Sequence, residues 1–550
     1  MHRYALIGLL TFFFPLASLA TTYSVCPDGS GDFNTIQAAI DASTGGEVIE
    51  LCDAIFSGDG NRDLDFGGRE ITVRSLSGNP EACIIDCGGT PGAPHRAFNF
   101  HLGEGHDAVL HGVTIRNGYA LVSGGGIICD GSSPSITDCV FEANHCVQYG
   151  CGLYCAFSTA SIDSCIFVGN GDGSAYAGGG MSCINASPSV SSCSFVSNSA
   201  DTGGGLHCAA NASPSVTFCT FMDNEAVPPN GFGGGLFCFS SGSPDLADCT
   251  FEGNTAVKGG GVSGYSDSDF SLTRCILSDN SAQEGGGIHL RQDCTSVLIH
   301  CTFSNNTATT DGGGMWCRES AAAMTGCTLS GNSAWSDGGG MYVFFANPTV
   351  ENTIIAFSAS GAAVHCVDPG SSPSLSCCDV YGNAGGDYVG CIATQAGVSG
   401  NISLDPFFCD AATEDYRLEE ASPCAPFTDP NAECDLIGAW PVGCGDSAVQ
   451  PPPPLAAHLY LEISPNPFSP ATRITYEIPQ ELSDARVQLA LIDPLGRLVR
   501  ILVDERHAAG QQTVTWDGHD ESGRPVGGGL YLVKLKVGDD CKTRRLLRLP

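Results

Sequence analysis

Apolar residues recur in short alternating runs through the middle of the chain, from Gly124 to about Asn383. Each run starts with a glycine triplet, followed by an aliphatic residue, a variable residue and usually cysteine; a Ser-Pro-Ser-Val-like segment and the phrase Cys-x-Phe-x-x-Asn come next. The triplets are spaced 25 to 30 residues apart, most often 26. This period predicts one structural unit per repeat, with each unit burying its apolar face against its neighbours. The triplets begin at Gly124, Gly150 (where Cys151 replaces the middle glycine), Gly178, Gly203, Gly233, Gly259, Gly285, Gly312 and Gly338.

The composition of the repeat predicts strands. It is rich in Gly, Ser, Thr, Asn and β-branched residues and has no helical pattern. One coil of a parallel β-helix, with three short strands and three corners, fits a repeat of this length, and successive coils stack about 4.8 Å apart. Side-chain alternation then predicts four inward columns, which in the first repeat contain Ile127, Cys129, Cys139 and Phe141.

An asparagine follows each Cys-x-Phe phrase at a constant offset of five residues from the cysteine. At a corner of the coil, such residues would stack and join the coils through amide hydrogen bonds, as asparagine ladders do in other stacked-strand structures. The predicted ladder contains Asn144, Asn170, Asn198, Asn224, Asn254, Asn280, Asn306 and Asn332.

The phrases GGG-[ILMV] and F-x-x-N resemble the GG[AILV] and FxxN repeats of chlamydial polymorphic membrane proteins and of bacterial right-handed β-helix repeat proteins. The resemblance covers residues 124 to about 385. It implies an all-β chain built on a right-handed, single-stranded parallel β-helix. It implies little about function, because β-helices serve as adhesins, lyases, esterases and plain surface proteins alike.

The segments on either side of the repeats have other predicted roles. Residues 1–20 are typical of a secretory signal peptide. Residues 21–123 are expected to form an N-terminal cap helix and irregular first coils; residues 26–42 resemble the opening of pectinesterases and pectate-lyase-like proteins, and Ile36, Ala39 and Ile40 fall on one face of the predicted helix. Regular coils are predicted for residues 124–390, a C-terminal cap for 391–445 and a stiff proline-rich linker for 446–457.

Residues 458–550 differ from the rest of the chain. They contain 12 basic and 12 acidic residues. The body of the chain, between the predicted signal peptide and this tail, contains 47 acidic and 10 basic residues and has a net charge of −37. Period-2 strands predict a small β-sandwich. Its motifs PNPF, LGRLV, WDGHD and GLY resemble the FlgD-type immunoglobulin-like module and the type IX secretion sorting domain. The resemblance implies partners in a secretion or surface-attachment machinery.

Thirty cysteines in an exported chain suggest a disulfide framework. Sixteen of them, counting Cys366 and Cys378, fall in the two repeat columns, where parallel Cβ vectors disfavour bridging between coils. We therefore expect mostly buried thiols in the columns. Bridges are expected among irregular cysteines, such as Cys83 and Cys87, or Cys391 and Cys444.

The charge excludes some partners. A body with a net charge of −37 repels nucleic acid phosphate and anionic membrane surfaces. We expect no cofactor and no zinc site, because the His-Cys pairs of the repeats place adjacent residues on opposite faces of a strand. Calcium is the one cation that such an acidic body suggests, although the acids are scattered and no calcium-binding loop motif is present. The mature chain contains no predicted transmembrane segment.

The column between the aliphatic and cysteine positions points outward, and seven of its ten residues are aromatic or histidine. Aromatic faces and guanidinium groups favour contact with a glycan or a protein partner. A structural ladder of mutually stabilising side chains explains the same column. The column contains Ile128, Tyr154, Ser182, His207, Phe237, Ser263, His289, Trp316, Tyr342 and His365. The candidate binding residues are Tyr154, His207, Phe237, His289, Trp316, Tyr342, Arg291 and Arg318.

No catalytic residue is predicted. Polygalacturonase-type hydrolysis needs converging carboxylates, and the repeat columns present no such pair. Asp267, Asp269, Asp293 and Asp311 fall mostly in variable corner loops. The preferred hypothesis is an exported, surface-attached, non-catalytic β-helix protein for adhesion, glycan contact or surface structure, located outside a bacterial cell or on its surface. The alternative is a polysaccharide lyase or hydrolase on the same scaffold.

Overall fold

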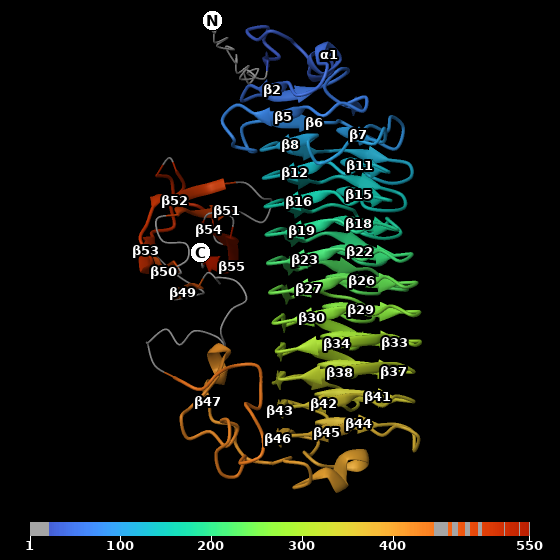
Figure 1. The fold of residues 1–550 in the computed structure, drawn as a ribbon, viewed down its shortest axis with the longest axis vertical. Helices are drawn as coiled ribbons and strands as arrows, with labels where there is room; N and C mark the ends of the chain where they lie inside the picture. The colour runs from blue at the N-terminus through green and yellow to red at the C-terminus, as the bar shows by residue number, and fades with distance from the viewer. Residues whose placement is uncertain are drawn as a thin grey trace, which may run out of the picture.

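The computed structural model describes residues 21–444 and, in the C-terminal part, 460–464, 471–478, 485–492, 498–521, 523–527, 529–537 and 540–548. The predicted signal peptide and proline-rich linker lie outside the described residues. Figure 1 shows a tall stack of coils with the C-terminal strands beside it. None of the helices in the described ranges is both long and apolar enough to cross a membrane.

Three long parallel sheets form the stack in the described ranges. The 14-stranded sheet contains β1 (Thr22–Val25), β2 (Val48–Leu51), β5 (Thr72–Ser75), β8 (Val109–His111), β12 (Ser135–Thr137), β16 (Ser161–Asp163), β19 (Ser189–Ser191), β23 (Ser215–Thr217), β27 (Asp245–Ala247), β30 (Ser271–Thr273), β34 (Thr295–Ile299), β38 (Ala321–Thr325), β42 (Thr349–Glu351) and β45 (Ser374–Ser376). The 12-stranded sheet contains β4 (Leu64–Asp65), β7 (Phe98–Phe100), β11 (Ile127–Asp130), β15 (Leu153–Ala156), β18 (Met181–Ile184), β22 (Leu206–Ala209), β26 (Leu236–Phe239), β29 (Val262–Tyr265), β33 (Ile288–Arg291), β37 (Met315–Arg318), β41 (Met341–Phe344) and β44 (Val364–Cys366). The 13-stranded sheet contains β3 (Ile55–Ser57), β6 (Ile84–Asp86), β9 (Thr114–Arg116), β13 (Val140–Glu142), β17 (Ile166–Val168), β20 (Ser194–Val196), β24 (Thr220–Met222), β28 (Thr250–Glu252), β31 (Ile276–Ser278), β35 (Thr302–Ser304), β39 (Thr328–Ser330), β43 (Ile354–Ala356) and β46 (Asp379–Tyr381).

Smaller elements complete the described fold. Corner strands pair β10 (Tyr119–Ala120) with β14 (His145–Cys146), β21 (Ser199–Ala200) with β25 (Glu225–Ala226), and β32 (Ser281–Glu284) with β36 (Thr307–Asp311) and β40 (Ser333–Ala334). After the last coil come η1 (Gly390–Gln395), β47 (Phe408–Asp410), η2 (Ala411–Thr413) and β48 (Asp415–Leu418). The tail forms antiparallel sheets from β49 (Tyr460–Ser464), β50 (Thr472–Ile478) and β53 (Gly510–Trp516), and from β52 (Leu498–Arg506), β51 (Arg486–Ile492), β54 (Gly529–Val537) and β55 (Asp540–Arg548).

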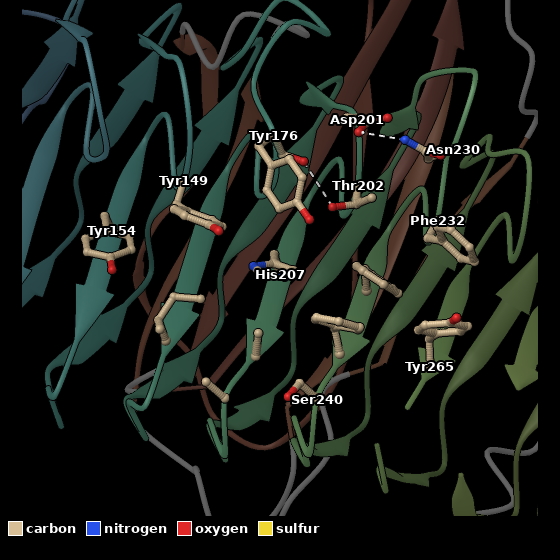
Figure 2. Close-up of a pocket in the computed structure, with 15 residues that line it drawn as sticks. Tyr149, Tyr154, Tyr176, Asp201, Thr202, His207, Asn230, Phe232, Ser240 and Tyr265 are labelled. Atoms are coloured by element: carbon tan, nitrogen blue, oxygen red, sulfur yellow. Dashed lines mark hydrogen bonds between the residues drawn. The ribbon is translucent and has the colours of Figure 1, made fainter. Parts of the chain in front are cut away.

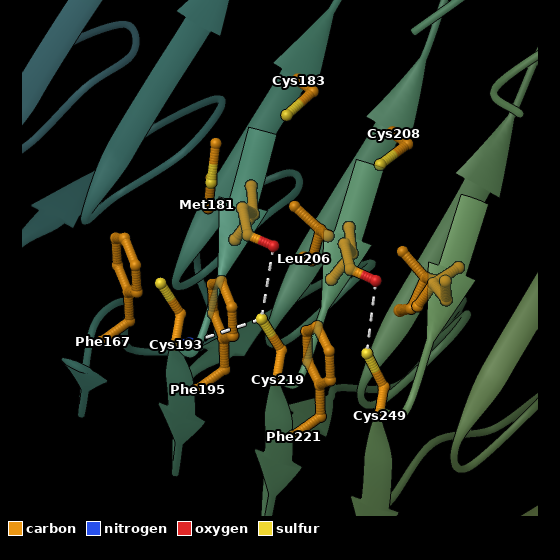
Figure 3. Close-up of a cluster of buried hydrophobic side chains, with 14 of the residues drawn as sticks. Phe167, Met181, Cys183, Cys193, Phe195, Leu206, Cys208, Cys219, Phe221 and Cys249 are labelled. Atoms are coloured by element: carbon orange, nitrogen blue, oxygen red, sulfur yellow. Dashed lines mark hydrogen bonds between the residues drawn. The ribbon is translucent and has the colours of Figure 1, made fainter. Parts of the chain in front are cut away.

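The predicted all-β architecture is confirmed, and the 26-residue phrase is one coil of the solenoid. In the interior, phenylalanine stacks on phenylalanine: the ring centroids of Phe167 and Phe195 are 4.7 Å apart, with the planes within 3°. Figure 3 shows this column beside the cysteine column that contains Cys193 and Cys219. Centroid spacing close to the strand spacing of a sheet means that identical side chains lie in register from coil to coil.

Glycine is needed where the coil turns into the 12-stranded sheet. The first glycine of the Gly203 triplet has φ +60°, and a Cβ at this position would lie 2.7 Å from the carbonyl oxygen of Leu206. Both the left-handed backbone and the close approach exclude other residues. The triplet therefore fixes the corner that leads into the sheet.

The short helix α1 (Ile36–Ala42) lies at the N-terminal end of the stack, and Ile36, Ala39 and Ile40 are fully buried, as the sequence pattern predicted. Its contacts are with β1, β2 and β4 of the first coils. Because an open β-helix end exposes apolar side chains and unpaired strand edges, this helix protects the first coil.

The cysteine ladder is confirmed, but two cysteine expectations were wrong. Nineteen described cysteines are unpaired and buried, and Cys83 and Cys87 are among them, unbridged. Cys366 belongs to a disulfide with Cys391 rather than to the buried thiols. Cys391 and Cys444 are both bridged, but not to each other. The five disulfides among the described residues are Cys26–Cys52, Cys146–Cys151, Cys366–Cys391, Cys377–Cys434 and Cys409–Cys444.

The asparagine ladder is also confirmed. The side-chain Nδ2 of Asn224 donates to Oδ1 of Asn254 at 3.0 Å and to the backbone oxygen of Phe195 at 2.9 Å. The backbone N–H and the Nδ2 of Asn198 both donate to Oδ1 of Asn224, each at 3.0 Å. Each internal amide thus bonds to the coils on both sides of it, with its polar groups satisfied although the side chain is fully buried.

The outer face of the 13-stranded sheet is covered by later parts of the chain. Ile492 and Leu532 of the tail pack on an apolar patch of β13 to β24, which contains Val140, Ile166, Val168, Val196 and Met222. Near the last coils, Leu418, Cys424 and Ile437 pack on Ile354 and Ala356. This sheet therefore has little outer surface left for a ligand.

Asn224→Asp is expected to lower the free energy of unfolding by about 3 to 5 kcal/mol. The new carboxylate would face the oxygens of Asn254 and Phe195 without a proton to donate. Urea unfolding followed by circular dichroism measures the change. The matched control is Asn211→Asp at an exposed position, where a shift within about 0.5 kcal/mol is expected; equal effects at the two sites would contradict the ladder.

The buried Asp379 predicts a pH-dependent contact between the last coil and the C-terminal cap. Its Oδ2 accepts a hydrogen bond from Sγ of Cys424 at 3.2 Å, and burial raises the pKa of this carboxyl to about 7. Because the folded pKa lies above the unfolded one, the stabilisation is complete below about pH 4 and is lost as the pH rises through 7. The loss reaches at most about 4 kcal/mol.

Proteolysis of residues 405–442 measures this contact. Cleavage of the native chain is expected to accelerate from pH 5 to pH 8, and Asp379→Asn is expected to flatten the profile. Comparing the two proteins at each pH cancels the contribution of other titrating groups. Parallel pH profiles would show that Asp379 does not titrate in this range.

Candidate binding site

The 12-stranded sheet carries the predicted ring ladder on its outer face. Strand pairing places the ten residues of the outward column in register, from Ile128 on β11 to His365 on β44. The ring planes of His289 and Trp316 are within 10°, with centroids 4.5 Å apart. Those of Trp316 and Tyr342 are within 8°, at 6.2 Å.

Serine interrupts the ladder twice, and at each gap the histidine of the next coil contacts both the serine and a ring from outside the ladder. Ser182 lies within hydrogen-bonding distance of Nδ1 of His207, with 3.0 Å between Oγ and Nδ1. The ring of Tyr149, from the position just before the glycine triplet, stacks against His207 with 6.0 Å between centroids. At the second gap, Oγ of Ser263 lies 3.3 Å from Nδ1 of His289, and the ring of Phe232 meets His289 edge-to-face, with 6.0 Å between centroids.

Packing buries much of the ladder. His207 and Phe237 are 2% and 5% exposed, and His289 and Trp316 are 0% and 5% exposed. Burial lowers the pKa of His207 to about 3 and holds that of His289 well below its usual value, so both imidazoles are neutral at pH 7. For these four of the eight candidate residues, packing within the ladder accounts for the burial of the side chain.

The other four candidates are partly exposed. Tyr154 and Tyr342 belong to the ladder, whereas Arg291 and Arg318 lie one position further along the outer face. The guanidinium carbon of Arg291 lies 5.8 Å from the ring centroid of Tyr265, and that of Arg318 lies 4.8 Å from the centroid of Phe344. Both arginines therefore make cation–π contacts within their own sheet.

A cavity of about 470 Å³ opens on this face. His207 of the ladder lies between the other labelled rings (Figure 2), and Phe237 of the ladder also lines the cavity. Tyr149 and Tyr154 lie on one side of His207, and the other lining tyrosines and phenylalanines include Tyr176, Phe232, Phe239 and Tyr265. The volume falls within the roughly 300–1,000 Å³ typical of small-molecule pockets. Of the eight candidate residues, Tyr154, His207 and Phe237 line the cavity; the other five do not.

The cavity arises from a second column that the sequence reading missed. The residues just before the triplets are bridged from coil to coil, and the column runs Tyr149, Ala177, Thr202, Phe232. Two large rings thus stand on either side of two small residues. A space remains between the rings, above the ladder. The signal was present in the sequence, because these positions repeat with the triplets.

Polar groups in the lining are mostly hydrogen-bond acceptors and hydroxyls. Oδ2 of Asp201 accepts a hydrogen bond from Nδ2 of Asn230 at 3.3 Å, whereas the buried Oδ1 of Asp201 has no partner. Partial burial raises the pKa of the Tyr149 and Tyr154 hydroxyls, so both stay protonated. The cavity therefore combines flat apolar faces with groups that bond to hydroxyls or amines.

The same missed column becomes charged in later coils. Lys258, Glu284, Asp311 and Asp337 follow Phe232 in register. The sequence analysis placed Asp311 in a variable corner loop and did not align it with the other two acids, so this column of acids was not recognised. Nδ1 of His365 lies 2.6 Å from Oδ2 of Asp337. Burial raises the pKa of Asp311, and the neighbouring charge of Asp337 adds to the increase.

A family model described as "Right handed beta helix region" matches residues 178–333 and 234–403. The repeat region is a right-handed parallel β-helix. A pectate lyase structure, Pel9A, aligns at 11% identity over 78% of this chain and 98% of its own, with a TM-score of 0.33. A pectin methylesterase from carrot aligns at 9% identity over 71% of this chain and 91% of its own, with a TM-score of 0.24. No curated protein matches the sequence.

The three faces of the β-helix differ in what they offer a ligand. The 13-stranded face is largely covered, and the 14-stranded face presents mainly short polar side chains, for example Ser189 and Ser215. The 12-stranded face carries both the aromatic cavity and the column of acids. This face is the candidate binding site.

The ladder predicts different roles for two tryptophans. Trp316→Ala is expected to lower the free energy of unfolding by about 3 kcal/mol, because it removes the ring between His289 and Tyr342. Trp335→Ala, at a residue that is 86% exposed, is expected to change it by less than about 0.5 kcal/mol. Urea unfolding of the two variants measures both values. A harmless Trp316→Ala would argue against packing as the role of this ring.

Proposed function

We propose that this chain is an exported, surface-attached, non-catalytic β-helix protein that binds a glycan in the aromatic cavity. The cavity is the observation that carries the proposal. Seven tyrosine and phenylalanine rings contribute to its described lining. Rings from two sides suit the apolar faces of a sugar, while hydroxyl, amide and carboxylate groups suit its hydroxyls.

The lining supports binding better than turnover at this cavity. Hydrolysis of a glycosidic bond ordinarily uses two carboxyl groups on either side of the bond. Among the described lining residues, Asp201 is the only carboxylate. The neighbouring histidine, His207, is buried and neutral, and its pKa of about 3 suits a packing role rather than proton transfer at pH 7.

Export and attachment rest on other parts of the chain. The signal-peptide-like residues 1–20 support export, and the disulfides are compatible with an extracellular location. The C-terminal tail, with its FlgD-like and sorting-domain-like motifs, is the part proposed to engage a secretion or attachment machinery. A cell-surface protein remains the alternative partner for the 12-stranded face.

A polysaccharide-active enzyme is the second candidate function. The column of Glu284, Asp311 and Asp337 favours it, because carboxylates on adjacent coils stand about 4.8 Å apart at their Cα atoms. The raised pKa of Asp311 also suits a general acid. This enzyme would release reducing ends or unsaturated uronate from a polysaccharide, and Asp311→Asn would abolish the release.

Binding is tested on an array of neutral and acidic oligosaccharides, followed by calorimetry with the best ligand. Tyr176→Ala and Tyr265→Ala remove rings from the cavity and are each expected to weaken binding at least tenfold, which corresponds to about 1.4 kcal/mol. Phe427→Ala, which removes an exposed ring outside the cavity, is the matched control and is expected to bind normally.

The state of the glycan after incubation distinguishes glycan binding from enzymatic cleavage. Mass spectrometry is expected to find it intact after prolonged incubation with the protein. Cleaved products that disappear in Asp311→Asn would favour the enzyme. Retention of full affinity by both cavity variants would remove the cavity from the proposal.

A further inference from the structure

We propose that Glu284, Asp311 and His289 form a second subsite on the 12-stranded face, which binds the ammonium groups of an amino-bearing glycan. The inference rests on the proposed glycan binding and names the class of glycan. The subsite is separate from the cavity, because none of its three residues lines it.

The acids of this subsite lie in register on neighbouring coils. Glu284 on β32 pairs with Asp311 on β36, and Asp311 is bridged to Asp337. Oδ1 of Asp337 accepts hydrogen bonds from the backbone N–H groups of Gly338 and Ala362, and Oδ2 faces His365. Asp337 is therefore already compensated. Asp311 has a smaller compensation, from the backbone N–H of Asp337 and from His365. Glu284 and Asp311 therefore carry the charge that a ligand can neutralise.

An unpartnered imidazole nitrogen points to the missing group. His289 is fully buried, and its Nε2 has no hydrogen-bond partner. This nitrogen lies 3.8 Å from Oε2 of Glu284, too far for a hydrogen bond. Oγ of Ser263 lies 3.3 Å from Nδ1 of His289. When Nδ1–H donates to this oxygen, Nε2 is an acceptor; in the other tautomer, Nε2–H faces the carboxylate but is too far away to bond to it. An ammonium group has three N–H donors and satisfies both Nε2 and the carboxylate, whereas a hydroxyl has one.

The charges of Lys258 and Arg291 act on His289, but among the described residues neither cation forms an ion pair with Glu284 or Asp311. Lys258, the lysine in register with Glu284, places its Nζ 4.9 Å from the ring centroid of Phe232. The guanidinium groups of Arg291 and Arg318 face other rings. Burial raises the pKa of Tyr342, and the charges of Asp311, Glu284 and Asp337 raise it further.

The surroundings favour an organic cation. The side chain of Glu284 is 33% exposed, so the pair of acids is reached from solvent. The ladder rings of Trp316 and Tyr342 run alongside the acid column in the same coils, and aromatic faces attract ammonium groups. The net charge of −37 on the body adds long-range attraction for a cationic ligand.

The subsite and the cavity meet at one residue. Phe232 lines the cavity and also contacts His289 edge-to-face, with 6.0 Å between the ring centroids. An elongated ligand can therefore occupy the cavity with one end and the acid column with the other. This continuity favours an oligosaccharide with free amino groups over a small polyamine or a lysine-rich peptide.

The experiment compares a glucosamine hexasaccharide with its fully N-acetylated counterpart, by calorimetry on the full chain at mildly acidic pH, where the probe is protonated. The free-amino probe is expected to bind at least tenfold more tightly. Raising the ionic strength from about 0.01 M to 1 M is expected to abolish this preference, because salt screens the charges. The double variant Glu284→Gln/Asp311→Asn is expected to bind both probes with the lower affinity.

Matched controls distinguish the loss of the subsite from a change in net charge and from a loss of folding. Glu351→Gln/Asp107→Asn removes the same charge from exposed positions elsewhere and is expected to keep the preference. Circular dichroism reports whether each variant is folded. The salt dependence of the native chain tests the subsite without any substitution.

Each result separates the two proposals. Equal affinity for both hexasaccharides, with binding lost in Tyr176→Ala, would overturn the subsite and leave the proposed glycan binding in place. Binding of spermine that depends on Glu284 and Asp311, without binding of any oligosaccharide, would overturn the glycan assignment for both sites. If the double variant still binds the free-amino probe more tightly, the ammonium groups of the probe bind elsewhere on the protein.

Discussion

The register of one coil on the next is the constraint on which the rest of the structure depends. A buried amide such as Asn224 bonds to the coil before it and the coil after it, and a slip by one residue would leave these groups unsatisfied in an apolar interior. Once the ladder fixes the register, every other position of the repeat also becomes a column. The inner phenylalanines, the cysteines and the outer rings all follow from this one alignment.

The sequence predicted the interior well because interior columns occupy strands of constant length. The offset from cysteine to phenylalanine to asparagine does not vary in the regular repeats, so the inward faces and the amide ladder could be read directly. The cavity was missed for the opposite reason. Its rings at Tyr149 and Phe232 belong to corners, where the repeat length varies between 25 and 30 residues, and their alignment becomes visible only when each is counted back from its triplet.

Burial on the outer face is a second point at which alternation alone was insufficient. The period of two correctly placed His289 and Trp316 outside the sheet, yet both are almost fully buried because neighbouring rings and corner residues cover them. The disulfides show the same limit. Register explains why the stacked thiols stay unpaired, since their Cβ vectors run parallel, but the bridge between Cys366 and Cys391 joins a column cysteine to an irregular segment beyond the repeats.

Columns also explain how one scaffold can hold two different surface sites. A residue of the β-helix contacts its own coil and the two adjacent coils, so a change of size or charge acts over a short distance. In the column before the triplets, ring size shapes the cavity around His207, and a change from Phe232 to Lys258 and Glu284 produces a charged surface within two coils. The inner columns and the amide ladder are the same under both regions. The outer columns can therefore vary in chemistry along the stack while the interactions that hold the coils together remain unchanged.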